Sequence, residues 1–338
     1  MAGSRRQQMF NDPNPSNLGN VAGIPPFLVM TTLTPTLAGS TILVHACVAN
    51  LSGNFVDKVK DSVNGFYTPA RRIDNPTNGL SNGLWYKQNA AALGVGDHGS
   101  VTSGTSTSLT DTSKNWTGVN FTGKTVLEYS SGNSWTVTSN TATVLNFSAG
   151  ATPVAGNLYV VGDYISVIMS NSDDYNAGHA EEWTGVAANS VVDHNMTATD
   201  IPVSGGVVGP NCVTTGLIVL GPDPCTLIGH CTNDVDGGST PFVPTIGQGL
   251  GYSDDGTMWI FDVGAPIARL QSVYIPNPLA LPSLTLDMKF TAQHPDNFQA
   301  NVIALRDAPV ATSQVGPSNR WRRRWSGESM GLNIKEWW

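Results

Sequence analysis

Short apolar runs separated by turn-forming residues dominate the pattern along this chain. The clearest is TILVHACV (41–48), whose continuous apolar character and β-branched start predict a fully buried strand. Turn signals follow at Leu51–Asn54 and at Asn64-Gly65. No segment keeps a 3.6-residue apolar period beyond two turns, so the pattern predicts an all-β protein. The other main strand candidates are LWYKQNAAAL (84–93), YISVIMS (164–170), HAEEWTGVA (179–187), TTGLIVLG (214–221), ARLQSVYI (268–275), LTLDMKF (284–290) and NVIALRD (301–307).

A block with a different composition interrupts this series of strands. Residues 98–162 are rich in Thr and Ser that alternate with Val, Leu, Trp and Tyr, and turn-like dipeptides lie at both ends. Domain insertions are tolerated at exposed turns. We therefore predict a β-sandwich core formed by residues 36–97 and 163–308, with an inserted small β domain at 98–162.

Both ends of the chain have patterns unlike the sandwich strands. Residues 1–35 are rich in Pro, Asn and Gly and show neither a helix nor a strand period, which predicts an extended N-terminal arm. Residues 309–338 begin as a linker that contains Pro, Ser and Gly, and they end in a basic, aromatic segment. We predict that they form a C-terminal anchoring tail.

Composition limits the classes of partner. Charged residues make up only 12% of the 338 residues, about half the usual share, so the polar surface must consist largely of Ser, Thr, Asn and Gly. Such surfaces are common in β proteins of large assemblies or of extracellular settings. The formal net charge of −8 argues against nucleic-acid binding by the body of the protein. The first residues, MAGSRRQQMF, lack the apolar stretch of a secretory signal, and no apolar run approaches the length of a membrane helix.

The sequence offers no recognisable catalytic or cofactor motif. It has no G-x-S-x-G, P-loop, G-x-G-x-x-G or H-E-x-x-H pattern, and its six histidines lack ligand spacing to one another. Cys225, His230 and Cys231 lie close together but lack a fourth zinc ligand, and Asp234 and Asp236 match only a fragment of a calcium loop. We therefore expect no enzyme activity, no cofactor and no metal. Acid pairs that a glycosidase would need to bring face to face occur at Asp173-Asp174, Glu181-Glu182 and Asp254-Asp255.

Tryptophans give the two remaining binding signals. Four of them lie in strand-like contexts, where they either fill the sandwich cores, as we favour, or form exposed platforms for sugars: Trp85, Trp116, Trp135 and Trp183. Four others lie in the basic tail, and Trp and Arg are the residues most enriched in binding hot spots. RWRRRW (320–325) is also compatible with DNA binding, although a single short run is a weak signal. The partner-binding residues that we predict are Arg320, Trp321, Arg322, Arg323, Arg324, Trp325, Trp337 and Trp338.

Several segments resemble, in order, a β-sandwich (Ig-like or jelly-roll-like) module of phage virion structural proteins and bacterial surface proteins. The most specific piece is EWTGVAANSVVD (182–193). The block at 98–162, with SLTDTSKNWTGVNFTGKTVLEY, SNTATVL and GNLYVVG, is similar to small β modules of phage tail and capsid-associated proteins. The other matching pieces are TILVHACV (41–48), DSVNGFYTPA (61–70), WYKQNAAALG (85–94), YISVIMS (164–170), GLIVLG (216–221) and NVIALRDA (301–308).

These resemblances imply architecture and setting and bring no catalytic residues. They imply a non-enzymatic virion structural protein, assembled in the host cytoplasm as a capsid-decorating, head-fibre or tail-associated subunit. Its partners would be other virion proteins or copies of itself, held through the terminal arms. The alternative is an adhesin module that binds a host-surface glycan or receptor.

Overall fold

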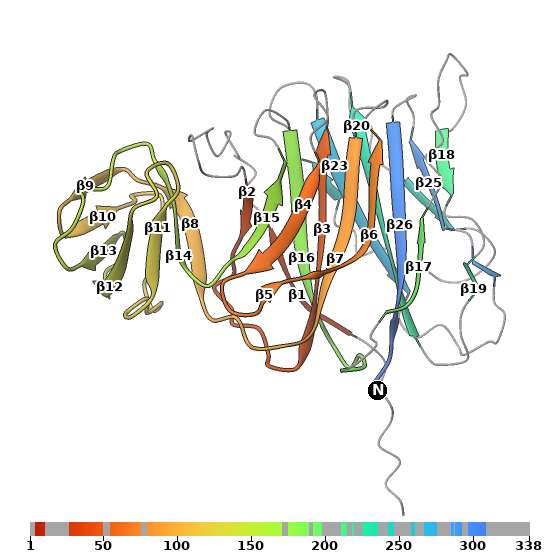
Figure 1. The fold of residues 1–338 in the computed structure, drawn as a ribbon, viewed down its shortest axis with the longest axis horizontal. Coiled ribbons are helices and arrows are strands. Elements are labelled where there is room, and N and C mark those ends of the chain that lie inside the picture. Colours follow the sequence, from red (N-terminus) through yellow and green to blue (C-terminus); the bar gives the residue numbers. More distant parts are fainter. Residues whose placement is uncertain are drawn as a thin grey trace, which may run out of the picture. The chain divides into compact units, whose positions relative to one another are not determined.

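The computed structural model shows an all-β protein, as the apolar pattern predicts. No helix occurs among the described residues, which form 26 strands in several antiparallel sheets (Figure 1). No helix in this part of the chain has the length and apolar character needed to cross a membrane. The chain divides into two units, Met1–Ala308 and Pro309–Trp338, and every described residue belongs to the first. The structure describes residues 4–10, 27–49, 55–75, 80–170, 175–188, 192–197, 211–214, 218–219, 225–235, 243–246, 258–260, 267–275, 285–286, 288–292 and 297–308.

A five-stranded antiparallel sheet, called the central sheet below, has apolar residues on both faces. Leu43 and Leu84 belong to one hydrophobic cluster, whereas their sequence neighbours Val44 and Trp85 belong to another. Because successive side chains of a strand point to opposite faces, this split requires two buried faces. The continuous apolar run of β3 has this cause, and the predicted fully buried strand is confirmed. In spatial order the strands are β1 (Ser4–Phe10), β16 (Tyr175–Thr184), β3 (Ser40–Ala49), β7 (Leu80–Ala90) and β6 (Thr68–Asn75).

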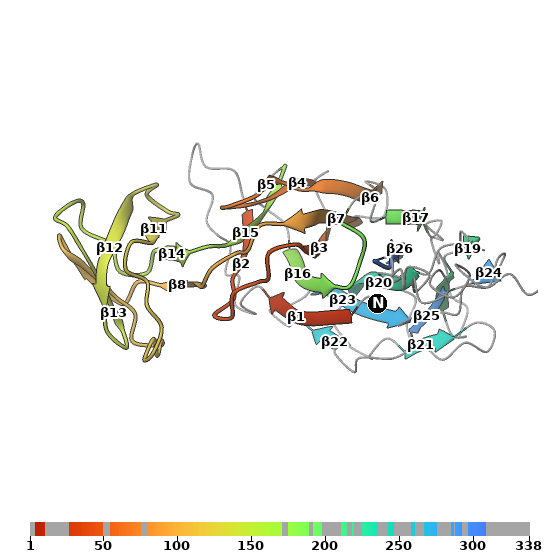
Figure 2. The ribbon, with the colours of Figure 1, turned by 90° about the horizontal axis from the view of Figure 1, so that it is seen from below.

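Two further sheets cover the two faces of the central sheet. The first, called the β4 sheet, supplies Leu28, Val59 and Val167 to the cluster that contains Val44. The second, called the β20 sheet, supplies Ile228 and Ile303 to the cluster that contains Leu43. Figure 2 shows β16 and β3 between β4 on one side and β23 on the other. Sequence reasoning predicted a sandwich and did not foresee this third layer.

The strands of these covering sheets come from separate parts of the sequence. The β4 sheet has the order β2 (Phe27–Met30), β15 (Ile165–Met169), β4 (Val56–Asp61) and β5 (Gly65–Phe66). The β20 sheet has the order β17 (Val192–Thr197), β26 (Asn297–Arg306), β20 (Cys225–Val235), β23 (Ile267–Ile275) and β22 (Met258–Ile260). Two small sheets contain β18 (Asn211–Thr214), β25 (Met288–Ala292) and β21 (Val243–Ile246), and β19 (Ile218–Val219) and β24 (Thr285–Leu286).

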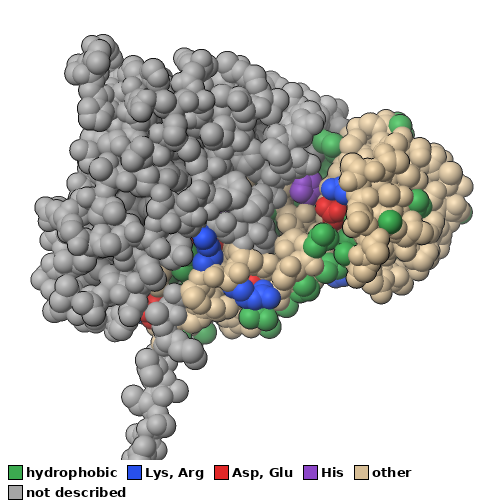
Figure 3. Space-filling model, turned by 180° about the vertical axis from the view of Figure 1, so that it is seen from behind, with side chains coloured by type: hydrophobic (Ala, Val, Ile, Leu, Met, Phe, Trp, Pro, Cys, Tyr) green, Lys and Arg blue, Asp and Glu red, His purple; other side chains and the backbone are tan. Residues whose placement is uncertain are grey.

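A seven-stranded sheet is formed by one continuous stretch of chain, Gly96 to Gly162. It has a hydrophobic cluster of its own around Trp116, Phe121 and Tyr159. Figure 3 shows mostly uncharged polar side chains and backbone on its visible surface, which agrees with the low charge content of the sequence. The order is β8 (Gly96–Ser100), β14 (Leu158–Gly162), β11 (Thr125–Glu128), β12 (Ser134–Asn140), β13 (Val144–Phe147), β10 (Ser108–Thr110) and β9 (Ser103–Thr105).

The two ends of this stretch pair directly with each other. Gly96 and Gly162 are partners in the antiparallel pair of β8 and β14. A Cβ atom on Gly96 would lie 1.9 Å from the Asp163 carbonyl oxygen, and one on Gly162 would lie 2.2 Å from the Val95 carbonyl oxygen. The two chain segments therefore approach too closely for any side chain at either glycine.

This pairing makes the predicted insertion at 98–162 testable by deletion. We expect that replacing residues 98–162 with a short Gly/Ser linker leaves a folded remainder, because directly opposed residues in such a pair lie only about 5 Å apart. Circular dichroism and a cooperative urea transition would measure this. Val29 packs against Tyr129 and Val160, so the deletion variant should also carry Val29→Ser to avoid an exposed apolar site. An insoluble product both with and without Val29→Ser would contradict the insertion.

The range predicted as an N-terminal arm contains two strands that the sequence pattern did not indicate. β1 pairs with β16, and β2 pairs with β15. β1 has the sequence SRRQQMF, which lacks an alternating apolar pattern. Its pairing is therefore determined by contacts with residues far away in the sequence, and local propensity does not reveal it.

Candidate functional site

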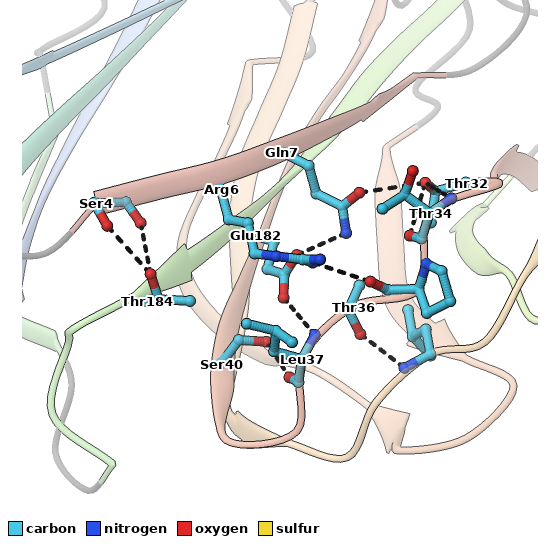
Figure 4. Close-up of polar contacts among 12 residues, drawn as sticks. Ser4, Arg6, Gln7, Thr32, Thr34, Thr36, Leu37, Ser40, Glu182 and Thr184 are labelled. Carbon is cyan, nitrogen blue, oxygen red and sulfur yellow. Dashed lines mark hydrogen bonds and ion pairs between the residues drawn. The ribbon is translucent and has the colours of Figure 1, made fainter.

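The side chain of Glu182 joins the N-terminal strand to the central sheet. Its Oε2 accepts hydrogen bonds from Arg6 Nη1 and Gln7 Nε2, both at 2.6 Å, and its Oε1 accepts one from Leu37 N at 2.6 Å (Figure 4). Glu182 has no exposed surface, whereas the Arg6 side chain is 31% exposed. Arg6 Nη1 also donates to the Pro35 carbonyl oxygen at 2.9 Å. One buried carboxylate thus holds both β1 and the segment that precedes β3.

A β-bulge lets two neighbouring arginines reach two neighbouring glutamates. The pairing of β1 with β16 shifts between Arg5 and Gln7, which leaves Arg6 as the extra residue. Arg6 and Gln7 therefore both bind Glu182. Arg5 Nη1 lies 3.6 Å from Glu181 Oε1. Because Glu181 and Glu182 are consecutive in a strand, their carboxylates lie on opposite faces of the central sheet and do not form the facing pair of a glycosidase.

A second buried polar group lies in the central sheet, around Glu181. Trp183 Nε1 donates to Glu181 Oε2 at 2.9 Å, and His179 Nε2 lies 3.3 Å from Glu181 Oε1. His45 is the direct strand partner of His179, with ring centroids 5.5 Å apart, and its Nε2 lies 2.7 Å from the side-chain oxygen of Asn82. His45 and His179 are 0% and 1% exposed, so these two are core histidines.

Two buried tyrosines each donate a hydrogen bond to a buried aspartate. Tyr67 OH donates to Asp61 Oδ2 at 2.9 Å, and Tyr159 OH donates to Asp111 Oδ2 at 2.8 Å. Burial, and then the nearby aspartate charge, raise the pKa of both phenols well above the usual value. Both tyrosines therefore stay protonated, and they act as hydrogen-bond donors that stabilise turns and the core of the seven-stranded sheet.

An open hollow of about 460 Å³ lies where β4 and β5 meet β6 and β7. Its most exposed aromatic side chain is Phe66, at 62%. Arg72 contributes a guanidinium group that lies 4.5 Å from the centre of the Phe55 ring and whose Nε donates to Asp74 at 2.6 Å. An exposed ring beside charged hydrogen-bonding groups is a suitable surface for a sugar. The lining residues are Asp57, Lys58, Phe66, Tyr67, Pro69, Arg72 and Trp85.

The interpretation of the four internal tryptophans as core residues is confirmed. Trp85, Trp116 and Trp183 are at most 2% exposed, and Trp135 is 7% exposed and stacks on Phe147 with centroids 5.0 Å apart. None of these four indoles therefore offers an exposed face to a sugar.

The tail residues predicted to bind partners, 320–325 and 337–338, lie outside the described residues. Cys225, His230, Cys231 and Asp234 lie on β20, and their side chains are likewise not described. Asp236 and the other two acid pairs fall outside the described ranges. Within those ranges, no group of three His, Cys, Asp or Glu side chains is placed to hold a metal.

Sequence reasoning singled out the acid pair Glu181-Glu182 and did not connect it with the adjacent cations Arg5 and Arg6. A usable signal was present, because two adjacent cations and two adjacent anions are conspicuous in a chain with only 12% charged residues. Consecutive strand residues point to opposite faces, so matched pairs of this kind suit neighbouring strands whose two faces are both covered. Comparison with known proteins gave no match to this chain among family models, curated proteins or solved structures.

Proposed function

We propose that this chain is a non-enzymatic structural subunit of a phage-like virion, which attaches to neighbouring subunits through its terminal arms. The observation that carries the proposal is the attachment of β1. This strand joins the edge of a complete sheet through backbone pairing and through Arg5 and Arg6, and none of its described side chains, Ser4 to Gln7, is buried. Terminal segments that add a strand to a sheet edge are a recurrent means of joining subunits.

The sequence of the tail supports the same role. Arg and Trp combine planar hydrogen-bond donors with large apolar surface, and truncating a buried hot-spot tryptophan to alanine weakens binding by about 2–4 kcal/mol. Four tryptophans in a basic segment are unusual for a solvated tail, since disordered tails are poor in aromatic residues. The proposed partner is an acidic, apolar-grooved surface of another virion subunit or of a second copy.

Truncation after Val310 tests the role of the tail. We expect the truncated chain to fold normally and to lose incorporation into particles, measured as copy number by quantitative mass spectrometry. A matched variant that changes Arg320, Arg322, Arg323 and Arg324 to Lys retains the charge and all four tryptophans, and it should be incorporated at least in part. Incorporation of the truncated chain at wild-type copy number would contradict the anchor. Binding that is lost steeply with salt and restored by added DNA would instead identify a nucleic-acid contact.

The hollow at Phe66 favours a second candidate function, the binding of a host-surface glycan. Phe66 is the most exposed large apolar side chain of the described residues, and Asp57, Lys58 and Arg72 surround the same hollow. Apolar faces of sugar rings pack on such aromatic rings, while charged neighbours bind the hydroxyl groups.

A glycan array with the purified chain tests this alternative. If glycan binding is the function, Phe66→Ala should weaken binding by about tenfold or more, because it removes the exposed ring. Val63→Ala is the matched control, because Val63 is 47% exposed in the same β4–β5 turn and does not line the hollow. Equal binding by both variants and the wild type, or no binding by any of them, would argue against a glycan site there.

A further inference from the structure

We propose that the edge of β16 binds strand β1 of a second copy of this chain, so that neighbouring subunits exchange their N-terminal strands. This inference rests on the proposed function and specifies the partner and the surface for one of the two arms. It starts from a feature of the β16 edge, called the receptor below: two wholly buried carboxylates, Glu181 and Glu182, lie beside this edge, and β1 alone among the described strands pairs with it. Each of them is paired with an arginine of that strand.

The groups that the structure describes in contact with β1 lie after residue 27. Glu181, Glu182 and Thr184 come from β16, and the Pro35 carbonyl oxygen comes from the segment before β3. The receptor is therefore complete without β1. A strand from another copy would find the same backbone pairing, the same bulge and the same two carboxylates.

The four described side chains of β1 contribute little to the interior of their own chain. Among the described side chains of β1, Arg5 and Gln7 are half-buried and Ser4 and Arg6 are exposed. None of them belongs to a hydrophobic cluster. Withdrawal of the side chains of Ser4 to Gln7 would remove nothing from a described hydrophobic cluster, yet it would leave two buried carboxylates without their arginines. A β16 edge without β1 is therefore destabilised by two buried carboxylates that lack their arginines. An edge paired with β1 of either copy has both arginines in place.

The length of the connection permits the exchange. Residues 11–26 join β1 to β2, and a chain of that length spans up to about 50 Å when extended. Because the contacts in the exchanged and unexchanged forms are the same, the balance between them depends on local concentration. Subunits that are packed side by side in an assembly supply that concentration.

Disulfide cross-linking between single variants tests the exchange. Ser4 and Thr184 are direct strand partners whose hydroxyl oxygens lie 3.2 Å apart. One chain should carry Ser4→Cys, and a second chain, enlarged by a fusion tag, should carry Thr184→Cys. After co-expression and mild oxidation, we expect a disulfide-linked heterodimer on a non-reducing gel, several-fold more abundant than with the wild-type chain and the tagged variant.

Matched controls distinguish disulfides that form through strand exchange from disulfides that form through chance collision of two cysteines. Thr107→Cys replaces Ser4→Cys at an exposed position in the turn between β9 and β10 and should give only the background level. An excess of a peptide with the sequence of residues 4–10 should suppress the heterodimer, and the same peptide with both arginines changed to alanine should not. A disulfide that forms only within the double variant Ser4→Cys/Thr184→Cys would overturn the exchange, as would the absence of any disulfide. In either case, continued incorporation of the wild-type chain into particles would leave the proposed function intact.

Discussion

Replacing Glu182 with glutamine is expected to lower the free energy of unfolding by about 3 kcal/mol. Both oxygens of Glu182 accept hydrogen bonds, Oε1 from Leu37 N and Oε2 from Arg6 and Gln7. Glutamine has the same size but only one acceptor oxygen, so its NH₂ group must face at least one donor. It also removes the negative charge that pairs with Arg6, at a position with no access to water. Urea denaturation followed by circular dichroism measures the difference.

Asp74→Asn is the matched control for this prediction. The ion pair of Arg72 with Asp74 has the same 2.6 Å separation as that of Arg6 with Glu182, but its side chains are 36% and 33% exposed. Exposed pairs contribute about 0–1 kcal/mol, so this variant should change stability little. If the two substitutions destabilise equally, burial is not what makes Glu182 important.

Gly162→Ala is expected to destabilise the protein by about 3 kcal/mol or more. Gly162 has a φ of 80°, in the left-handed region, and a Cβ atom there would lie 2.2 Å from the Val95 carbonyl oxygen. The obstacle is backbone, so a change of side-chain conformation cannot relieve it. The expected result is a marked fall in the urea midpoint.

Gly156→Ala separates the two causes of this strain. Gly156 has a φ of 86°, but a Cβ atom there would meet nothing within 4 Å. Only the backbone conformation opposes the substitution, at a cost of about 1 kcal/mol. A Gly162→Ala variant no less stable than Gly156→Ala would show that the segments that meet at Gly162 can separate freely.

The local sequence pattern was sufficient to predict those elements whose burial is evident from the types of consecutive residues. The run that becomes β3 is apolar throughout because both faces of the central sheet are covered. The burial of Trp85 and Trp183 was expected because large aromatic rings fill sandwich cores. The Thr/Ser-rich block at 98–162 was distinguishable by composition, and the structure forms a seven-stranded sheet from nearly the same residues.

Features that depend on distant pairing could not be predicted in this way. β1 has no apolar alternation, since its attachment comes from Arg5 and Arg6 meeting glutamates on β16. The β20 sheet was not foreseen as a third layer, because an apolar strand does not indicate which sheet it covers. The hollow at Phe66 likewise combines strands that are separate in the sequence.

The buried polar residues of β16 also bear on how the chain avoids misfolding. A strand that is apolar on both faces loses little hydrophobic burial when it pairs one residue out of place, so apolar contacts alone select the correct partner weakly. In β16, such a slip would carry Glu181 and Glu182 to the wrong sides of the sheet, away from the arginines that neutralise them. It would also separate His179 from His45. Each charge left without its partner costs several kcal/mol, so these residues of β16 specify a pairing register that the apolar neighbouring strand β3 specifies only weakly.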